Sequence, residues 1–450
     1  MNPTIFRKYD IRGIVGVDFT ESEAAAVGRG FGTYLRRLGR KHLTVGRDCR
    51  ISSEAVAASF IRGLSETGCH VTDIGICPTP VLYFSIHHLR RDGGAMITAS
   101  HNPPEYNGFK LCLGLDSVFG DDLQAIRKLI DQEDFESGEG RVERLDVVPD
   151  YRKHLLDGIR LARPLRIGVD AGNGTAGVVA VPILRALGCE VHELYCEMDG
   201  RFPNHEADPT VLDNLKDLTN LVKTEKLDLG VGYDGDGDRI GVIDPTGQIV
   251  YGDQLMILFS REILSRRPGA TVISEVKCSQ TLYDDIETNG GTAVMWKTGH
   301  SLIKKKMKEM NAVLAGEMSG HMFFADRYLG YDDAIYATCR LLEILARSQQ
   351  SPLQLLADVP RTFTTPEIRV DCPDDIKFAL VEKATAYFRK RHDVIDIDGV
   401  RIRFEDGWGL IRASNTQPAL VLRFEALSAD RLADIRHTVE SALAQLRKER

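Results

Sequence analysis

Three aspartates at alternate positions carry the clearest chemistry in this chain. They are Asp234, Asp236 and Asp238 of the segment YDGDGDR, and glycines separate them. In an extended loop alternate residues point to the same side, so the three carboxylates face one another. Like charges placed so close need a cation, and oxygen ligands suit magnesium or calcium rather than zinc. The segment therefore predicts a magnesium site.

Two other interpretations of this segment can be compared with it. An EF-hand calcium loop needs glycine at its sixth position and glutamate at its twelfth. Those positions hold Arg239 and Pro245 here, which argues against an EF-hand. A solvated acidic turn is the remaining alternative.

A second candidate is Ser100, in the segment AMITASHNP. Taken alone, Ser-His-Asn-Pro at the end of a strand is typical of a turn. The serine-hydrolase pattern GxSxG is absent, because Ala99 and His101 flank the serine. Phosphoryl transfer to Ser100 is the other reading, and it requires a metal and cationic side chains around the phosphate.

Loops elsewhere supply such cations. Most lysines and arginines are ordinary surface charges, but these stand at the starts of loops. The residues are Arg12 with Tyr9 in YDIRG, Lys110 in GFK, Lys277 in EVKC, and His300 in KTGH. The segment RASNTQP adds an arginine fork and hydroxyls that are typical of an anion-binding loop. Its residues are Arg412, Ser414, Asn415 and Thr416.

The segment AGEMSGH could bind a sugar. Glu317 and Ser319 are two residues apart, so in an extended loop both could reach neighbouring hydroxyl groups. A turn is equally compatible with this segment, and His321 could be an ordinary buried histidine. The glycine-rich segment DAGNGTAG at 170–177 matches neither GxGxxG nor a Walker A sequence, so we interpret it as a structural turn.

The elements that position these loops follow an α/β pattern. Short apolar or β-branched runs alternate with longer helical segments, and each run precedes one polar loop. The polar loops should therefore lie at the carboxyl ends of strands, where open α/β sheets bind ligands. The predicted strands lie within 42–48, 70–80, 93–103, 164–177, 188–200, 227–239, 270–280, 291–300 and 312–321.

The last 90 or so residues show a different pattern of apolar and polar residues. Val400, Ile402 and Phe404 alternate with polar residues, which predicts antiparallel strands with one face in solvent. The polar set is Arg401, Arg403 and Glu405. A helix should follow from Ser428. We expect three related α/β domains with mixed sheets and a smaller C-terminal α+β domain around a central cleft, at residues 1–145, 146–245, 246–361 and 362–450.

Composition narrows the class of protein. The net charge of -8 argues against a sequence-independent nucleic-acid binder. Nine cysteines without a CxxC pair suggest neither a disulfide framework nor a thiolate zinc site. The sequence has no apolar run long enough for a membrane span and no signal peptide at its start. We therefore expect a cytoplasmic protein that binds neither nucleic acid nor membrane.

Seven motifs together resemble those of the α-D-phosphohexomutases, specifically the bacterial phosphomannomutase/phosphoglucomutase branch. In chain order they are FRKYDIRG, TASHNP, GFK, DGDGDR, KTGH, GEMSGH and RASNTQP. The resemblance implies four domains around one deep cleft. It also implies an isomerase that interconverts the 1-phosphates and 6-phosphates of mannose and glucose through a phosphoserine. The cofactor would be Mg2+, and glucose 1,6-bisphosphate or mannose 1,6-bisphosphate would be the intermediate and activator.

The same resemblance assigns roles to residues. Ser100 would be the phosphoserine and, with Asp234, Asp236 and Asp238, a metal ligand. The further catalytic residues would be Arg12, His101, Lys110, Arg239 and His300. The phosphosugar would be bound by Tyr9, Lys277, His300, Glu317, Ser319, His321, Arg412, Ser414, Asn415 and Thr416. Small phosphosugars would be the partners, and the resemblance favours a monomer.

Two alternatives to this activity remain. The GEMSGH loop and the asparagine of SNTQP resemble the dual mannose/glucose branch, whereas phosphoglucosamine mutases usually read DGDADR. Gln417 departs from a glutamate that is common in the last motif. The first alternative is a phosphoglucosamine mutase, and the second is a non-catalytic protein that binds sugar phosphates.

Overall fold

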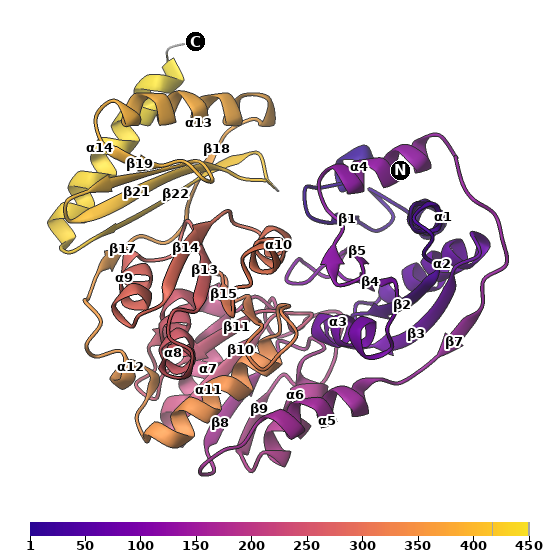
Figure 1. The fold of residues 1–450 in the computed structure, drawn as a ribbon, viewed down its shortest axis with the longest axis horizontal. Helices are drawn as coiled ribbons and strands as arrows, with labels where there is room; N and C mark the ends of the chain where they lie inside the picture. Colours follow the sequence, from indigo (N-terminus) through magenta and orange to yellow (C-terminus); the bar gives the residue numbers. More distant parts are fainter. Residues whose placement is uncertain (416, 449–450) are drawn as a thin grey trace.

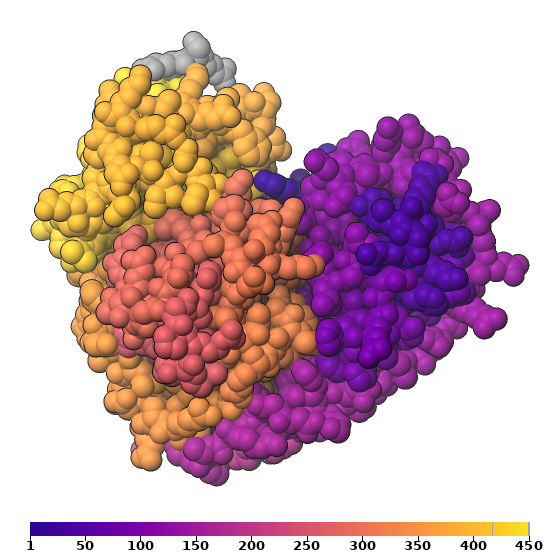
Figure 2. Space-filling view, viewed as in Figure 1, coloured from indigo at the N-terminus to yellow at the C-terminus, as the bar shows by residue number. Residues whose placement is uncertain are grey.

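The computed structural model describes residues 1–415 and 417–448. Within these residues the chain forms four β-sheets (Figure 1). The first sheet lies at the right of Figure 1, the second at the bottom, the third in the middle and the fourth at the upper left. Figure 2 shows a notch between the purple N-terminal part and the yellow C-terminal part. None of the described helices combines the length and apolar character that a membrane span requires.

The first sheet is mixed and has the strand order β1-β5-β4-β2-β3-β7, with β6 paired to β5. β4, β2, β3 and β7 are parallel, while β5 runs antiparallel to both β1 and β4. Its strands are β1 (Ile11–Ile14), β2 (His42–Arg47), β3 (His70–Ile76), β4 (Gly93–Ile97), β5 (Tyr106–Leu113), β6 (Asp116–Ser117) and β7 (Val142–Arg144). The helices are η1 (Pro3–Ile5), α1 (Glu21–Arg37), α2 (Ser53–Glu66), α3 (Thr79–His88) and α4 (Asp121–Asp131).

The second sheet has the order β12-β11-β10-β8-β9, with β10, β8 and β9 parallel and a β10–β11 hairpin. Every residue of β10 is buried, because helices cover both faces of a parallel sheet. Its strands are β8 (Arg166–Asp170), β9 (Glu190–Leu194), β10 (Leu229–Tyr233), β11 (Ile240–Ile243) and β12 (Ile249–Val250). The helices are α5 (Val148–Gly158), α6 (Gly177–Ala186), η2 (Leu212–Leu215) and α7 (Lys216–Glu225).

The third sheet has the order β14-β13-β15-β16, and β13 is parallel to both of its neighbours. Its strands are β13 (Thr271–Glu275), β14 (Thr292–Trp296), β15 (Leu314–Gly316) and β16 (Met322–Phe324). The helices are α8 (Gly252–Arg266), α9 (Gln280–Thr288), α10 (His300–Met310), α11 (Ala334–Ser348) and α12 (Pro352–Leu355). As predicted, the loops that carry Ser100, the aspartates, Lys277, His300 and Glu317 follow the carboxyl ends of β4, β10, β13, β14 and β15. Arg12 and Lys110 were expected at the starts of loops, but they lie within β1 and β5.

The fourth sheet pairs its strands antiparallel in the order β17-β22-β21-β20-β19, with β18 also paired to β22. Its strands are β17 (Phe363–Thr364), β18 (Ile368–Asp371), β19 (Asp393–Ile395), β20 (Val400–Phe404), β21 (Gly407–Ala413) and β22 (Ala419–Ala426). Two helices pack on this sheet, α13 (Asp374–Arg389) and α14 (Ala429–Lys448). The predicted fold class, three mixed-sheet α/β units and a smaller α+β unit, is confirmed.

One detail of the fourth sheet corrects the sequence analysis. Arg401 was expected on a face in solvent, but its side chain is fully buried. Its Nη1 donates to the carbonyl oxygens of Val276 and Cys278, each at 2.7 Å, and its guanidinium lies 3.8 Å from the ring centroid of Trp408. The face without helices is therefore covered in part by the unit built on the third sheet, which strand alternation cannot reveal.

The apolar core is shared between sheets. One cluster of buried residues runs from Ile74 to Leu356 and includes residues of α3, the second sheet and the third sheet. The fourth sheet has a separate cluster that runs from Cys372 to Leu446. The second and third sheets are therefore held as one body, and α3 of the first unit packs against it.

Candidate active site

The aspartate loop follows β10, where the chain turns into β11. Asp234, Asp236 and Asp238 are all fully buried. The Oδ1 atom of Asp234 accepts hydrogen bonds from the backbone N–H of Asp238 at 3.0 Å and of Arg239 at 3.1 Å. Burial, followed by the charges of the two neighbouring aspartates, raises the pKa of Asp234 well above its usual value. The loop therefore needs a cation to keep all three carboxylates ionised.

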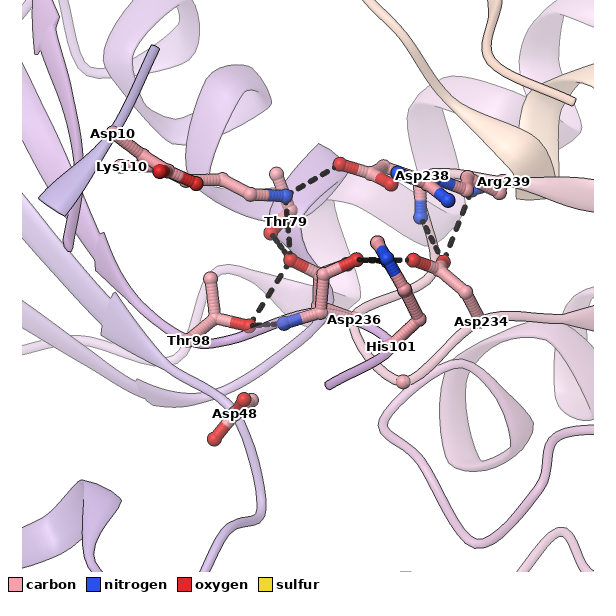
Figure 3. Close-up of polar contacts among 12 residues, drawn as sticks. Asp10, Asp48, Thr79, Thr98, His101, Lys110, Asp234, Asp236, Asp238 and Arg239 are labelled. Carbon is pink, nitrogen blue, oxygen red and sulfur yellow. Dashed lines mark hydrogen bonds and ion pairs between the residues drawn. The ribbon is translucent and has the colours of Figure 1, made fainter. Parts of the chain in front are cut away.

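The donor set fits a magnesium ion. One carboxylate oxygen of each aspartate lies within 4.8 Å of the others. The Oδ1 atoms of Asp236 and Asp238 are buried and have no hydrogen-bond partner among the described residues. A hard cation would satisfy these oxygens, which otherwise carry a desolvation cost. Figure 3 shows the three aspartates around this point, with Lys110 on one side and His101 in front.

Ser100 lies against this loop. Its Oγ is 2.6 Å from Asp234 Oδ2 and 3.1 Å from His101 Nδ1. The backbone of Ser100 has a φ of 51°, in the left-handed region, so a tight turn after β4 points the hydroxyl at the aspartates. Gly235 permits this approach, because a Cβ there would lie 2.4 Å from the Ser100 carbonyl oxygen. The serine and the aspartate loop therefore form one site.

Arg50 holds the serine loop in place, and the sequence analysis missed it. Its guanidinium is buried and donates to the carbonyl oxygens of Ser100 at 2.8 Å, Asn102 at 2.6 Å and Tyr106 at 3.1 Å. Its own charge is balanced by Asp48 at 3.1 Å. Asp48 and Arg50, two opposite charges at and just after the end of the predicted strand at 42–48, were the sequence feature that could have indicated this role.

The glycine-rich segment at 170–177 supports the aspartate loop from behind. The backbone N–H of Thr175 donates to the Gly235 carbonyl oxygen at 3.1 Å. A Cβ on Gly174 would lie 2.6 Å from the same oxygen, so only glycine allows this packing. The contacts agree with the structural role predicted for this segment.

Lys110 and His101 flank the aspartates with opposite protonation preferences. The Nζ of Lys110 lies 2.7 Å from Asp236 Oδ2 and 2.6 Å from Asp238 Oδ2. Burial opposes its charged form, but these carboxylates outweigh burial and raise its pKa. Burial, followed by the charges of Arg239 and Arg12, lowers the pKa of His101 well below its usual value. Lys110 is therefore a fixed cation, whereas His101 is neutral.

A pair of histidines lies on the opposite side of the aspartate loop. Arg239 Nε donates to His321 Nε2 at 2.9 Å, and the ring of His300 stacks on that of His321 with a centroid distance of 5.6 Å. Burial, followed by the charge of Lys304, lowers the pKa of His300 well below its usual value. Asp332 Oδ2 lies 3.1 Å from His321 Nδ1, and sequence patterns gave no sign of this contact.

The predicted sugar-binding residues follow β15. Glu317 Oε1 accepts a hydrogen bond from the backbone N–H of Gly299 at 2.6 Å, and Ser319 Oγ lies 3.4 Å from Glu317 Oε2. Burial raises the pKa of Glu317. Lys277, after β13, forms an ion pair with Glu367 at 2.6 Å. The segment forms a turn, in which the backbone N–H of Gly320 donates to the Glu317 carbonyl oxygen at 3.0 Å, so it is not the extended loop that the spacing argument assumed.

The predicted phosphate loop joins β21 to β22. Arg412 pairs with Asp398 at 3.1 Å. Asn415 Nδ2 donates to the hydroxyl of Tyr9 at 2.8 Å, although Tyr9 belongs to the first unit. Ser414 Oγ accepts a hydrogen bond from the backbone N–H of Gln417 at 3.1 Å. Thr416, also predicted for this loop, lies outside the described residues.

Arg12 lies beside the serine loop. Its Nη1 donates to Asn102 Oδ1, and its Nη2 lies 2.6 Å from Asp10. Most predicted site residues within the described part of the chain therefore lie in the network around Ser100 and the aspartates or in the third and fourth units, whereas Tyr9 belongs to the first unit and contacts the other two.

Comparison with known proteins identifies the family. Models of all four phosphoglucomutase/phosphomannomutase domains match the chain: the alpha/beta/alpha domains I, II and III at residues 3–137, 149–247 and 251–363, and the C-terminal domain at 367–442. The chain belongs to the phosphoglucomutase/phosphomannomutase family. The resemblance predicted from the seven motifs is thereby confirmed. Members of this family are Mg2+-dependent phosphohexomutases, which are isomerases.

Individual members of the phosphoglucomutase/phosphomannomutase family are similar over nearly the whole chain. A phosphomannomutase/phosphoglucomutase of Pseudomonas aeruginosa is 47% identical over 441 residues, which cover 98% of this chain and 95% of that protein. A phosphoglucomutase of Neisseria gonorrhoeae is 43% identical over 427 residues, 94% of this chain and 93% of that protein. The crystal structure of a family member from Burkholderia thailandensis matches with a TM-score of 0.95 and 42% identity, over 99% of this chain and 98% of that one.

Proposed function

We propose that this protein is a phosphomannomutase/phosphoglucomutase, which reversibly interconverts the 1-phosphates and 6-phosphates of mannose and glucose. The observation that carries the proposal is the 2.6 Å contact between Ser100 Oγ and Asp234 within a fully buried aspartate trio. A phosphoryl group on Ser100 would lie against the metal and the cation Lys110, as phosphoryl transfer requires. Full-length similarity to enzymes of both names supports the pair of substrates.

In the proposed reaction the phosphoryl group of Ser100 passes to the free hydroxyl of a hexose 1-phosphate or 6-phosphate. The Ser100 Oγ–P bond breaks and Oγ takes up a proton from an acid, while the new O–P bond gives a hexose 1,6-bisphosphate and the sugar hydroxyl loses its proton to a base. The bisphosphate then reorients within the site and returns its other phosphoryl group to Ser100. Ser100, Asp234, Asp236 and Asp238 would hold a Mg2+ ion, which would neutralise charge on the transferring group. Glucose 1,6-bisphosphate or mannose 1,6-bisphosphate would also act as activator.

The surrounding residues stabilise charge, transfer protons and bind the phosphosugar. Lys110 and Arg12 are cations beside the transferring phosphate, and the neutral ring of His101, 3.1 Å from Ser100 Oγ, can accept a proton. The proposed catalytic set is Ser100, Arg12, His101, Lys110, Arg239 and His300. The proposed phosphosugar-binding set is Tyr9, Lys277, His300, Glu317, Ser319, His321, Arg412, Ser414, Asn415 and Thr416.

Within this set we assign the sugar and its second phosphate to different units. Glu317 and Ser319 hold the 3- and 4-hydroxyls, where mannose and glucose do not differ, so both sugars are accepted. The loop at Arg412 binds the phosphate that is not being transferred. We further propose four domains at 1–145, 146–245, 246–361 and 362–450, a monomer, and a cytoplasmic location.

Intact-mass measurement and turnover test the proposal. Part of the purified protein should be heavier by one phosphate, and the phosphate should map to Ser100. Ser100→Ala should abolish both the mass increase and the mutase activity, whereas Ser265→Ala, on the exposed side of α8, should change neither. Full turnover by Ser100→Ala would refute the covalent mechanism.

Substrate choice separates the two alternatives. Conversion rates should be compared for mannose 1-phosphate, glucose 1-phosphate and glucosamine 1-phosphate. We expect the first two to react well. A strong preference for glucosamine 1-phosphate would favour a phosphoglucosamine mutase, and phosphosugar binding without turnover would favour a non-catalytic binder.

A further inference from the structure

Glu275 is a buried carboxylate at the end of the central strand of the third sheet. It is the last residue of β13, which is paired with β14 on one side and β15 on the other. Its side chain is fully buried. None of the seven motifs assigns it a role. A carboxylate in such a place is costly unless hydrogen bonds satisfy its oxygens.

The donors to this carboxylate come from three different loops. Oε2 accepts hydrogen bonds from the backbone N–H of Lys277 at 2.8 Å and from the Thr298 hydroxyl at 2.9 Å. Oε1 accepts one from the backbone N–H of Met318 at 3.4 Å. These residues follow β13, β14 and β15 respectively, so one side chain joins the loops at the carboxyl ends of three neighbouring strands.

Each of these loops carries residues of the proposed substrate site. Lys277 is a phosphosugar-binding cation in the proposal, and its Nζ lies 3.7 Å from Glu275 Oε1. Thr298 is two residues before His300. Met318 lies between Glu317 and Ser319, the proposed partners of the sugar hydroxyls. Among the described residues, every hydrogen bond to the Glu275 carboxylate comes from one of these loops.

We infer that Glu275 is a positioning residue, which sets the relative placement of the three substrate-binding loops of the third domain. The inference rests on the proposed function for the identity of the substrate. A buried carboxylate needed only for packing could draw its donors from any part of the core. Here its donors are the loops themselves, so removing the carboxylate takes away the one side chain that contacts all three loops among the hydrogen bonds of the described residues, although Gly299 and Glu317 still join two of them.

This placement predicts a defect in sugar recognition more than in the chemical step. Ser100 and the aspartates lie on other loops, so they should remain ordered without Glu275. Lys277 and the Glu317–Ser319 pair would lose their fixed spacing, which weakens binding in the ground state and the transition state alike. Discrimination at the 4-hydroxyl should also fall, because Met318 is the neighbour of both hydroxyl-binding residues.

The test compares Glu275→Ala and Glu275→Gln with the wild type and with Asp326→Asn. Asp326 is a matched control, since it is a buried carboxylate of the same domain whose partners are Arg266 and Arg340, away from the three loops. Four quantities should be measured: KM and kcat with glucose 1-phosphate, the preference for glucose 1-phosphate over its 4-epimer galactose 1-phosphate, the calorimetric Kd for glucose 1-phosphate, and the phosphate content of Ser100.

For Glu275→Ala we expect KM and Kd to rise about tenfold, a smaller change in kcat, a reduced preference against the 4-epimer, and an unchanged ability of Ser100 to carry phosphate. Glu275→Gln keeps one acceptor oxygen and should lie between alanine and wild type. Asp326→Asn should keep the wild-type KM and sugar preference, even where its thermal stability falls.

Several outcomes would overturn the inference. One is a folded Glu275→Ala with wild-type Kd and sugar preference, and another is an equal loss of affinity in Asp326→Asn. If Glu275→Ala does not fold, wild-type Kd and preference in Glu275→Gln overturn it instead. A wild type that binds glucose 1-phosphate without turning it over refutes the proposed function, while the Kd comparison still decides the role of Glu275.

Discussion

The hydroxyl of Tyr9 donates a hydrogen bond to the carbonyl oxygen of Thr298 at 3.0 Å, across 289 positions of the chain. The side-chain amide of Asn415 donates to the same hydroxyl at 2.8 Å. Residues of the first, third and fourth units therefore meet at one phenol group. A closed contact of this kind would exclude water from the site and protect the phosphoserine proposed at Ser100 from hydrolysis.

Replacing Gly299 should disturb this contact. Gly299 has a φ of 128°, and a Cβ there would lie 2.8 Å from the Tyr9 ring. We expect Gly299→Ala to lower kcat/KM at least about tenfold, a loss of about 1.4 kcal/mol in transition-state stabilisation. Tyr9→Ala should lower kcat/KM by a smaller factor in the Gly299→Ala background than in the wild type. Gly290→Ala is the control, because Gly290 has a φ of 76° with nothing within 4 Å. Wild-type kcat/KM in Gly299→Ala would contradict the prediction.

Replacing Arg50 should destabilise the protein and its serine loop together. Arg50→Met leaves the buried Asp48 carboxylate without its charged partner and removes the donors to four carbonyl oxygens, those of Ser100, Asn102, Pro103 and Tyr106. The expected loss in the free energy of unfolding is about 3–5 kcal/mol. Urea unfolding measures this loss, and the phosphate content of Ser100 should fall with it. The comparison variant is Arg185→Met, whose exposed pair with Glu193 should contribute about 1 kcal/mol or less. Equal losses in both variants would disprove the assigned role.

Magnesium should both activate and stabilise the protein. Chelation should abolish mutase activity, and added Mg2+ should restore it. The thermal unfolding midpoint should rise with Mg2+ concentration, because the ion binds the folded aspartate loop. This rise should be lost in Asp236→Asn and kept in Asp213→Asn, since Asp213 is an exposed carboxylate of the same unit. An equal rise in both variants would place the ion elsewhere.

Asp333 should make stability depend on pH. Burial raises the pKa of this carboxyl to about 6, against hydrogen bonds from the hydroxyls of Tyr328 at 2.6 Å and Tyr151 at 2.9 Å. The folded state therefore holds this proton more tightly than the unfolded state, whose pKa is near 3.8. Its contribution to stability is present below about pH 4 and is lost as pH rises through about 6.

Urea unfolding between pH 4 and pH 7 checks this sign. The difference in unfolding free energy between wild type and Asp333→Asn should fall by roughly 3 kcal/mol as pH rises across this range. Asp326→Asn is again a useful control. The pKa of Asp326 is lowered, because hydrogen bonds and charges from Arg266 and Arg340 outweigh burial. The difference in unfolding free energy between wild type and Asp326→Asn should therefore stay constant above about pH 4. A flat difference for Asp333→Asn would show that its pKa is not raised.

Much of the site could be predicted from the sequence, because it is built from short segments at strand ends. The spacing of Asp234, Asp236 and Asp238 places three carboxylates within five residues, and Ser100 follows a recognisable apolar strand. Each loop follows the carboxyl end of a strand, as α/β topology predicts, but Ser100 follows the first sheet and the aspartates follow the second, so the topology of one sheet does not explain why the two loops meet.

The residues that the sequence analysis missed act over longer distances. Arg50 binds carbonyl oxygens 50 or more positions away, and Glu275 reaches the backbone of Met318, 43 positions away. No local spacing marks such residues. Arg401 shows a different kind of error. The alternation of apolar and polar residues around it correctly predicts a strand, but it does not reveal the neighbouring domain that covers the outer face of that strand.

Helix α3 shows that the units of this chain are not interchangeable modules. The helix belongs to the first unit by sequence, yet its buried residues Val81, Leu82 and Phe84 sit in the core shared by the second and third sheets. A fragment that ends near residue 145 would expose this apolar surface and tend to aggregate. A cut near residue 362 leaves the C-terminal unit with a core of its own, but it exposes Trp408 and Leu410, which are buried together with Val276 of the third unit. Exchange of a single unit would therefore have to supply matching apolar surface at either boundary.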